Sequence, residues 1–207
     1  PTHRNTSWEQ AKFEVCGHKW ADLSEGNYGV ALLNDCKYGY DAREHVLRLS
    51  LLRSPVRPDG QSDLGAHEFT YALLPHAGNW RQAQVDRRAY ELNMPVLARG
   101  LDSLGAQADG GLPAVYSLLE TDGQSIIVET LKQAESGDGL ILRTFDSHGN
   151  HLKARFVTAE KLTAVVETNL LEEEATSVSV ADCHHFGAAY TPYEIKTHRL
   201  EIERSSK

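Results

Sequence analysis

The sequence lacks any long apolar run. No uninterrupted stretch approaches the roughly 20 apolar residues that a helix needs to cross a bilayer. The start, Pro1 to Asn5, also lacks the charged-then-apolar layout of a secretory signal peptide. The sequence therefore predicts a soluble protein with no membrane partner. Its first residue is proline rather than methionine, which indicates either a piece cut from a longer chain or a processed one.

An excess of positive charge is also missing. The 207 residues carry a formal net charge of -8 at pH 7, and no stripe of lysine or arginine is interleaved with aromatic residues. A protein that binds nucleic acid needs a basic surface to meet the phosphate backbone. This composition excludes nucleic acid as an expected partner.

Cysteine is scarce. Cys16, Cys36 and Cys183 are three in number and form no C-x-x-C pair. They indicate neither a disulfide framework nor a zinc ribbon. A reducing compartment fits best, and we expect a cytoplasmic location.

What the sequence does have is alternation of apolar and polar residues, which is typical of β-strands. In the first half, apolar residues alternate around Tyr28 to Leu33, Leu47 to Leu52 and Phe69 to Leu74. Both faces of these segments are partly apolar, so we expect sheets that are covered on both sides. A helix is expected from Trp80 to Leu92, with Asn79 as its N-cap.

A break in this pattern predicts two domains. Residues 102–112 are rich in Gly, Asp and Ala, and we interpret them as a linker between a domain at 1–101 and a smaller one at 113–207. Short strand signals separated by turn residues then predict a small antiparallel β-sandwich. The expected strands are Ser125 to Leu131, Leu140 to Phe145, Leu152 to Val157, Leu162 to Glu167, Ser177 to Val180, and Glu194 to Ile202.

Candidate chemistry is sparse, and the residues alone leave function open. The string from Asp182 to His185 contains metal-binding residue types, but neighbouring side chains on a strand diverge, which favours a polar loop. No G-x-S-x-G nucleophile motif occurs. A cluster of carboxylates fits a glycosidase acid pair only weakly, because acidic residues at strand ends are usually solvated. These carboxylates are Asp22, Glu25, Asp35, Asp41 and Glu44.

Five stretches nevertheless resemble one family. They are "THRNTSWEQAKFEVCGHKWADLSEGNYGVALLNDCKYGYD" from Thr2 to Asp41, "LRLSLLRSP" from Leu47, "HEFTYALLPHAGNW" from His67, "NLLEEE" from Asn169, and "PYEIKTHRLEI" from Pro192. Each is similar to the C-terminal region of family 38 glycoside hydrolases, the α-mannosidases, in the branch of bacterial and cytosolic-type enzymes. The resemblance implies an all-β fold, in which part of a large mutarotase-like antiparallel sandwich is followed by a smaller immunoglobulin-like sandwich.

The same resemblance implies a function. Family 38 enzymes are retaining and use an aspartate nucleophile and a zinc ion, both held in N-terminal catalytic and helical domains whose motifs are not found here. We therefore expect no catalytic residue and no metal in this chain alone, with zinc as a cofactor of the parent enzyme. The expected partners are those N-terminal domains and a mannose-containing carbohydrate. The loop implied to face the sugar contains the candidate substrate-binding residues Asn34, Asp35, Lys37, Tyr38 and Tyr40.

Other functions stay open. The chain can be a stand-alone carbohydrate-binding module that uses Trp8, Trp20, Trp80 and the aromatics from Tyr28 to Tyr40. A free-standing mutarotase-like enzyme would need His and Glu partners in one cleft, and the adjacent His67 and Glu68 should face opposite ways. Strand faces that are apolar on both sides also predict self-association of the piece by itself.

Overall fold

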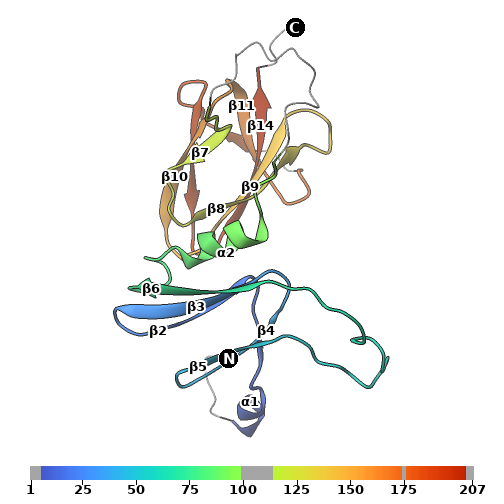
Figure 1. Cartoon of the computed structure of the whole chain (residues 1–207). Helices are drawn as coiled ribbons and strands as arrows, with labels where there is room; N and C mark the ends of the chain where they lie inside the picture. Colours follow the sequence, from blue (N-terminus) through green and yellow to red (C-terminus); the bar gives the residue numbers. More distant parts are fainter. Residues whose placement is uncertain (1–5, 99–113, 174–175, 204–207) are drawn as a thin grey trace. The chain divides into compact units, whose positions relative to one another are not determined.

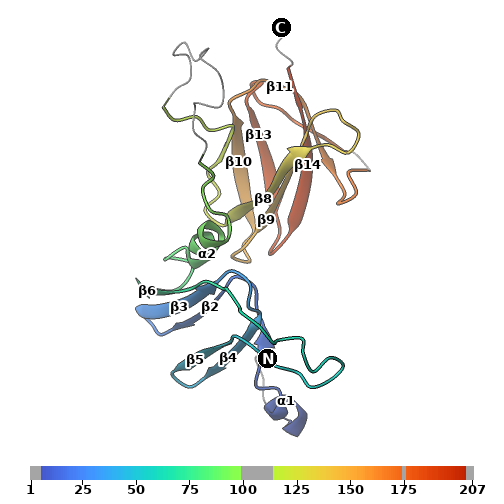
Figure 2. The same ribbon diagram turned by 45° about the vertical axis from the view of Figure 1, so that its right-hand side comes forward.

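The computed structural model describes residues 6–98, 114–173 and 176–203. The chain divides into two compact units, Pro1–Arg99 and Gly100–Lys207, which are drawn from two directions in Figures 1 and 2 and are treated separately below. The predicted linker, 102–112, lies outside the described residues. Antiparallel strands dominate both units, which confirms the all-β prediction. No described helix is long and apolar enough to cross a membrane.

Residues 6–98 of the first unit form two small antiparallel sheets and two helices. One sheet has the strand order β1-β4-β5 and the other β2-β3-β6. The elements are α1 (Ser7–Ala11), β1 (Val15–Cys16), β2 (Trp20–Ser24), β3 (Tyr28–Asn34), β4 (Gly39–Arg43), β5 (Val46–Ser50), β6 (Tyr71–Ala77) and α2 (Val85–Asn93).

Strand β3 is the centre of this unit because it pairs with β2 on one side and β6 on the other. Its side chains alternate, so that Ala31 and Leu33 lie on one face and are buried against Val85 and Ala89 of α2. The helix therefore covers one face of the β2-β3-β6 sheet. Of the two faces that were expected to be covered, α2 covers one.

Helix α2 begins later than the sequence indicated. The predicted start at Trp80 is wrong, because the Asn79 side chain accepts hydrogen bonds at 3.0 Å from the backbone of Arg81 and Gln82 and closes a separate turn. Gln84 then adopts a left-handed conformation with φ of 52°, and regular helix begins at Val85. Helix α1 was not predicted, although Thr6 and Glu9 form a capping box at its start.

The second unit is a β-sandwich, visible as two layers in Figure 1. Its sheets have the strand orders β13-β10-β7 and β12-β11-β14-β9-β8, and all pairs are antiparallel. The strands are β7 (Leu119–Thr121), β8 (Ile126–Gln133), β9 (Leu140–Asp146), β10 (Leu152–Thr158), β11 (Leu162–Thr168), β12 (Thr176–Val178), β13 (His185–Tyr190) and β14 (Ile195–Ile202).

Six of these strands lie where the sequence predicted them, within a few residues. Strands β7 and β13 were not predicted. Strand β13 was missed because Gly187, Ala188 and Ala189 have low β propensity. It forms because every one of its residues pairs with β10 and because Phe186 stacks on Phe156 with ring centroids 4.9 Å apart. The core between the two sheets thus overrides local preference.

A histidine is buried in this core. His198 on β14 is 0% exposed and lies with its ring centroid 5.4 Å from that of Phe186. Neither ring nitrogen has a hydrogen-bond partner in the described part of the chain, and Nε2 is 3.8 Å from the Glu167 carboxylate. Burial lowers the pKa of His198 to about 4, so the imidazole is neutral at pH 7.

We expect the second unit to lose stability in acid. The unfolded chain takes up a proton at His198 near its ordinary pKa of 6.5, whereas the folded chain resists protonation until about pH 4. The contribution of His198 to the unfolding free energy therefore has its full value above pH 6.5. It falls progressively as the pH is lowered toward 4, by roughly 3 kcal/mol in total. His198→Leu should abolish most of this pH dependence.

The measurement uses urea unfolding followed by far-UV circular dichroism between pH 4 and 7.5. All three tryptophans lie in the first unit, so their fluorescence reports that unit separately. The exposed His151 provides the matched control, and His151→Leu should leave the wild-type pH dependence in place. An unaltered pH dependence in His198→Leu would contradict this assignment.

Candidate functional site

The loop from Asn34 to Tyr40 connects β3 with β4 and is built around one buried amide. Asn34 Nδ2 donates a hydrogen bond to the Tyr40 hydroxyl, and Asn34 Oδ1 accepts one from the Lys37 backbone N–H at 2.6 Å. Both Asn34 and Tyr40 are buried. Because β3 and β4 belong to different sheets, the hydrogen bond between Asn34 and Tyr40 joins the two sheets of the unit.

The backbone at Asn34 is held from two further directions. Its N–H donates to the Lys19 carbonyl at 2.9 Å, just before β2. Its carbonyl accepts a hydrogen bond at 3.0 Å from the side chain of Asn93, the last residue of α2. The start of the loop is therefore tied to both a strand and the helix.

Asp35, the next residue of the loop, is hydrogen-bonded to the backbone just before β6. Its carboxylate accepts from the Thr70 N–H at 3.0 Å, and its own N–H donates to the Thr70 carbonyl at 3.2 Å. A hydrogen bond from the Cys36 thiol, together with that from Thr70, lowers the pKa of Asp35. The same hydrogen bond raises the pKa of the Cys36 thiol, which keeps it protonated.

Lys37 and Tyr38 lie on the outer side of the loop, which Asn34, Asp35 and Tyr40 hold in place. The Lys37 ammonium lies 4.7 Å from the centroid of the Phe69 ring, a cation–π distance. The Tyr38 ring is 55% exposed and meets His18 edge-on at 5.1 Å, while its backbone carbonyl accepts from Gly17 at 3.0 Å. These two side chains present an ammonium and a phenol hydroxyl at the surface.

The structure thus divides the five predicted site residues into two groups. Asn34 and Tyr40 point into the unit and hold the loop, whereas Asp35, Lys37 and Tyr38 lie on the loop itself. Tyr40 is 2% exposed, so its ring is not available for stacking on a sugar in this structure. His18 and Phe69 were not predicted. Their only signals in the sequence are their places within the first and third resembling stretches.

The tryptophans do not form a single platform for a sugar. Trp20 and Trp80 pack on each other with ring centroids 5.0 Å apart and contact the core beneath α2. Trp8 is exposed on α1. A carbohydrate module based on all three side chains is therefore not supported by their placement.

The carboxylate cluster is also dispersed. Asp22 pairs with His76 at 2.8 Å on the helix-covered face of the sheet, Asp41 pairs with Arg48 at 2.5 Å, and Asp35 binds Thr70. Only Glu25 and Glu44 line a common groove. His67 and Glu68, the pair considered for a mutarotase-like enzyme, precede β6 and lie in no strand. The predicted strand start at Phe69 is correspondingly too early.

The metal-like string in the second unit forms a polar turn. The Asp182 carboxylate hydrogen bonds with His185 and accepts from the His184 N–H, while His184 Nδ1 contacts the Thr158 carbonyl at 2.9 Å. Across residues 6–98, 114–173 and 176–203, no group of three His, Cys, Asp or Glu side chains is placed to hold a metal ion.

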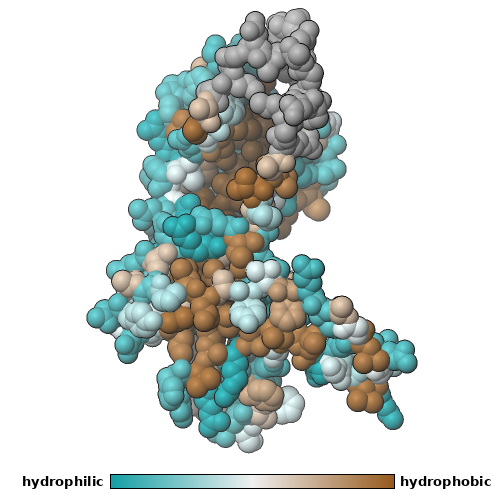
Figure 3. All heavy atoms as spheres, in the orientation of Figure 1, coloured by the Kyte–Doolittle hydropathy of each residue, from teal (hydrophilic) through white to brown (hydrophobic). Residues whose placement is uncertain are grey.

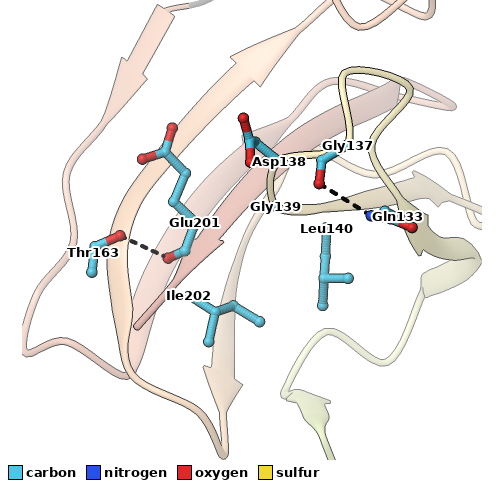
Figure 4. Close-up of a pocket in the computed structure, with 8 residues that line it drawn as sticks. All are labelled: Gln133, Gly137, Asp138, Gly139, Leu140, Thr163, Glu201 and Ile202. Atoms are coloured by element: carbon cyan, nitrogen blue, oxygen red, sulfur yellow. Dashed lines mark hydrogen bonds between the residues drawn. The ribbon is translucent and has the colours of Figure 1, made fainter. Parts of the chain in front are cut away.

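A wide hollow opens at one end of the sandwich, with a volume of about 720 Å³. Figure 4 shows Leu140 and Ile202 on one side of it and the Asp138 and Glu201 carboxylates on the other. The dashed hydrogen bonds, from Thr163 to the Glu201 carbonyl and from Gln133 to the Gly137 carbonyl, join residues of the rim to one another. The described lining contains no aromatic ring and no cation, so it offers a sugar no ring to stack on.

Two family patterns match the chain. Residues 1–61 match the glycosyl hydrolases family 38 C-terminal domain, and residues 125–198 match the glycosyl hydrolases family 38 C-terminal beta sandwich domain. Together these matches span well over half of the chain, with one in each unit.

Curated relatives align along nearly the whole chain. Alpha-mannosidase 2C1 of Homo sapiens is 40% identical over 98% of this chain, and Alpha-mannosidase G of Dictyostelium discoideum is 40% identical over 97%. The Alpha-mannosidase of Saccharomyces cerevisiae is 33% identical over 98%. The chain spans only 18–19% of the length of these relatives.

Two solved structures from Enterococcus faecalis share the fold. A protein in glycosyl hydrolase family 38 superposes with a TM-score of 0.70 at 21% identity, over 91% of this chain and 22% of that one. An alpha-mannosidase superposes with a TM-score of 0.71 at 20% identity, over 97% of this chain and 23% of that one. Here too the chain corresponds to a minor part of a much longer polypeptide.

Removing the hydroxyl that Asn34 contacts should destabilise the first unit. In Tyr40→Phe the buried Asn34 amide loses its acceptor, which costs about 1–3 kcal/mol of unfolding free energy. Urea unfolding followed by tryptophan fluorescence measures this loss. Tyr38→Phe, the same change at the exposed ring, is the control and should leave the midpoint unchanged. Equal midpoints for wild type and Tyr40→Phe would refute the role assigned to this hydrogen bond.

Proposed function

Since this chain belongs to the C-terminal region of glycosyl hydrolase family 38, we propose that it is the non-catalytic β part of a retaining, zinc-dependent α-mannosidase that hydrolyses terminal α-mannosides. One observation carries this proposal. Relatives named alpha-mannosidases are 39–40% identical to the chain over 97–98% of its residues. Similarity of this extent supports a common parent architecture.

In the proposed parent enzyme, the residues that cleave the glycosidic bond lie in the rest of the polypeptide. The chain corresponds to 19% of the length of the mouse and human relatives. The described side chains do not fit a zinc site, because their histidines, cysteines and carboxylates are dispersed or paired within the fold. In this proposal zinc supplies its charge at a site built by the N-terminal domains, and the present chain holds no metal.

The part assigned to this chain is to complete the sugar pocket with the Asn34 to Tyr40 loop. Lys37 and Tyr38 carry the groups suited to sugar hydroxyls, since an ammonium donates hydrogen bonds and a phenol both donates and accepts them. Asn34 and Tyr40 support the loop from beneath, and Asp35 fixes it to Thr70. The rigidity of this frame favours a binding role, because a pre-positioned group loses little conformational entropy when it meets a ligand.

A stand-alone carbohydrate-binding module is the second candidate. The exposed Tyr38 ring favours it, since aromatic rings stack on the apolar faces of sugars. Titration of the chain with mannose oligomers separates the two. A module binds them without any other domain, whereas one wall of a pocket does not.

A cytoplasmic location and a tendency of the isolated piece to self-associate also belong to this proposal. The thiols of Cys16, Cys36 and Cys183 are free and exposed, which suits a reducing compartment. Several large apolar side chains in the first unit are exposed, which favours association when nothing else covers them.

The isolated chain should have no α-mannosidase activity. The proposal assigns catalysis to the N-terminal domains, and Asp22, Asp35 and Asp41 are each held by partners within the fold. The assay is release of the aryl group from an aryl α-mannoside, with and without added zinc. Turnover that copurifies with the chain, and that disappears when Glu25 or Glu44 is changed to glutamine, would refute the assignment of catalysis to other domains.

Lys37 and Tyr38 should matter for turnover in the intact parent enzyme. Lys37→Ala and Tyr38→Phe should each lower kcat/KM by about ten- to a hundredfold, the equivalent of about 1.5–3 kcal/mol for a hydrogen bond that involves a charged or pocket-bound group. The melting temperature should stay near the wild-type value, because neither side chain is buried in the core.

Lys12→Ala is the matched control, since Lys12 makes a comparable cation–π contact with Trp8 at 5.6 Å on α1, outside the loop. It should change neither kcat/KM nor melting temperature. If both loop variants keep wild-type kinetics but melt earlier, the loop is a structural element and not a wall of the pocket.

A further inference from the structure

The Lys37 ammonium is held by an aromatic ring rather than by a counter-ion. Its Nζ lies 4.7 Å from the centroid of the Phe69 ring, and within residues 6–98, 114–173 and 176–203 it forms no ion pair. The side chain is nevertheless half-buried. Burial removes water from a charge, so a lysine in such a place normally gains a carboxylate partner. Here the contact with Phe69 takes the place of that ion pair.

A lysine of the second unit shows the more usual arrangement. Lys196 is also half-buried, and its ammonium lies 2.6 Å from the Glu167 carboxylate and 3.3 Å from that of Glu194. Those carboxylates cancel its charge and occupy its N–H donors. An aromatic ring instead attracts a cation through its quadrupole, and it leaves the charge uncancelled. The Lys37 ammonium therefore keeps both its charge and N–H donors for a ligand.

An acidic side chain lies close to Lys37 in the sequence but is engaged elsewhere. The Asp35 carboxylate accepts from the Thr70 N–H at 3.0 Å, and the Asp35 N–H donates to the Thr70 carbonyl at 3.2 Å. Thr70 directly follows Phe69. The hydrogen bonds that engage Asp35 therefore also fix the backbone of Phe69 beside the loop, where its ring meets the ammonium.

Contacts between lysines and aromatic rings recur in the first unit. Hydrophobic residues gather on the face of this unit that is seen in Figure 3. Its three lysines, Lys12, Lys19 and Lys37, all lie over aromatic rings. The ring over which Lys12 lies belongs to Trp8, four residues before it in the chain. Lys37 differs from Lys12 because its ring comes from a distant segment that is hydrogen-bonded to the candidate loop.

We propose that Phe69 is a positioning residue for the sugar site, which holds the Lys37 ammonium through a cation–π contact and leaves its N–H donors for a sugar oxygen. This inference rests on the proposed function, in which Lys37 faces the pocket. It names Phe69 as a residue that acts through Lys37 rather than on the sugar. A free lysine side chain loses much rotamer freedom when it is ordered. Because the ring already restrains Lys37, less of that freedom is lost when a ligand binds.

Removal of the ring should slow the intact parent enzyme only while Lys37 is present. Phe69→Leu should lower kcat/KM by about two- to thirtyfold, the range for the loss of one cation–π contact. In the Lys37→Ala background the same change should alter kcat/KM by less than about twofold, because the ring no longer has a partner. Phe69→Tyr keeps an aromatic face and should retain most of the wild-type kcat/KM.

A fluorinated ring separates the electrostatic contact from packing. Trifluorophenylalanine at position 69 keeps the shape of the native side chain, but the fluorines weaken the negative face of the ring. It should lower kcat/KM as Phe69→Leu does, without a change in melting temperature. Trp8→Leu is the matched control, since it removes the ring beside Lys12 on α1 and should leave kcat/KM unchanged.

The outcomes separate this inference from the proposed function. If Lys37→Ala is impaired but Phe69→Leu and the fluorinated enzyme keep wild-type kcat/KM, the inference is overturned and the proposed function stands. Equal losses from Phe69→Leu with and without Lys37 would also overturn it, because Phe69 would then act through packing alone. Wild-type kinetics in Lys37→Ala would reject the proposed sugar contact, and the positioning role with it. If Phe69→Leu fails to fold, the fluorinated enzyme decides.

Discussion

The first unit depends on the buried side chain of Asn34. Its amide donates to Tyr40 in the other sheet and accepts from the backbone of Lys37, and its main-chain carbonyl is held by Asn93 of α2. A primary amide can satisfy a donor and an acceptor at once, which few other side chains of this size can do. Two sheets, a helix and a loop therefore meet at a single residue. Without it, the loop would lose its anchor and the sheets the hydrogen bond that joins them.

The same residue separates the structural side of the loop from its outward side. Inward, Asn34 and Tyr40 fill the space between the sheets, and the Tyr40 ring lies so close to Gly17 that an added Cβ there would be 3.0 Å from it. Outward, Lys37 and Tyr38 are supported by single aromatic neighbours, Phe69 and His18. Rigid support beneath and polar groups above are what a binding wall needs.

Alternation in the sequence was sufficient to predict the antiparallel β architecture. In segments such as Tyr28 to Leu33 and Leu140 to Phe145, apolar side chains recur at every second residue, as they do along a strand. Alternation was insufficient for β13, where Gly187 to Ala189 carry no β signal and pairing with β10 decides the structure. The loop was identified by its resemblance to the family. Which of its side chains are buried and which face outward could not be predicted. The burial of Tyr40 depends on Gly17 and Asn34, and the support of Lys37 depends on Phe69, contacts that no local pattern encodes.

The most direct measurement is a crystal structure of the parent enzyme with a mannose-derived inhibitor bound. We expect the Lys37 ammonium or the Tyr38 hydroxyl to lie within about 3.2 Å of a sugar oxygen, or to reach it through one ordered water. Asn34 should still hold Tyr40 beneath the loop. A structure in which the loop lies far from the inhibitor, with the sugar enclosed wholly by other domains, would show that this chain forms no wall of the pocket.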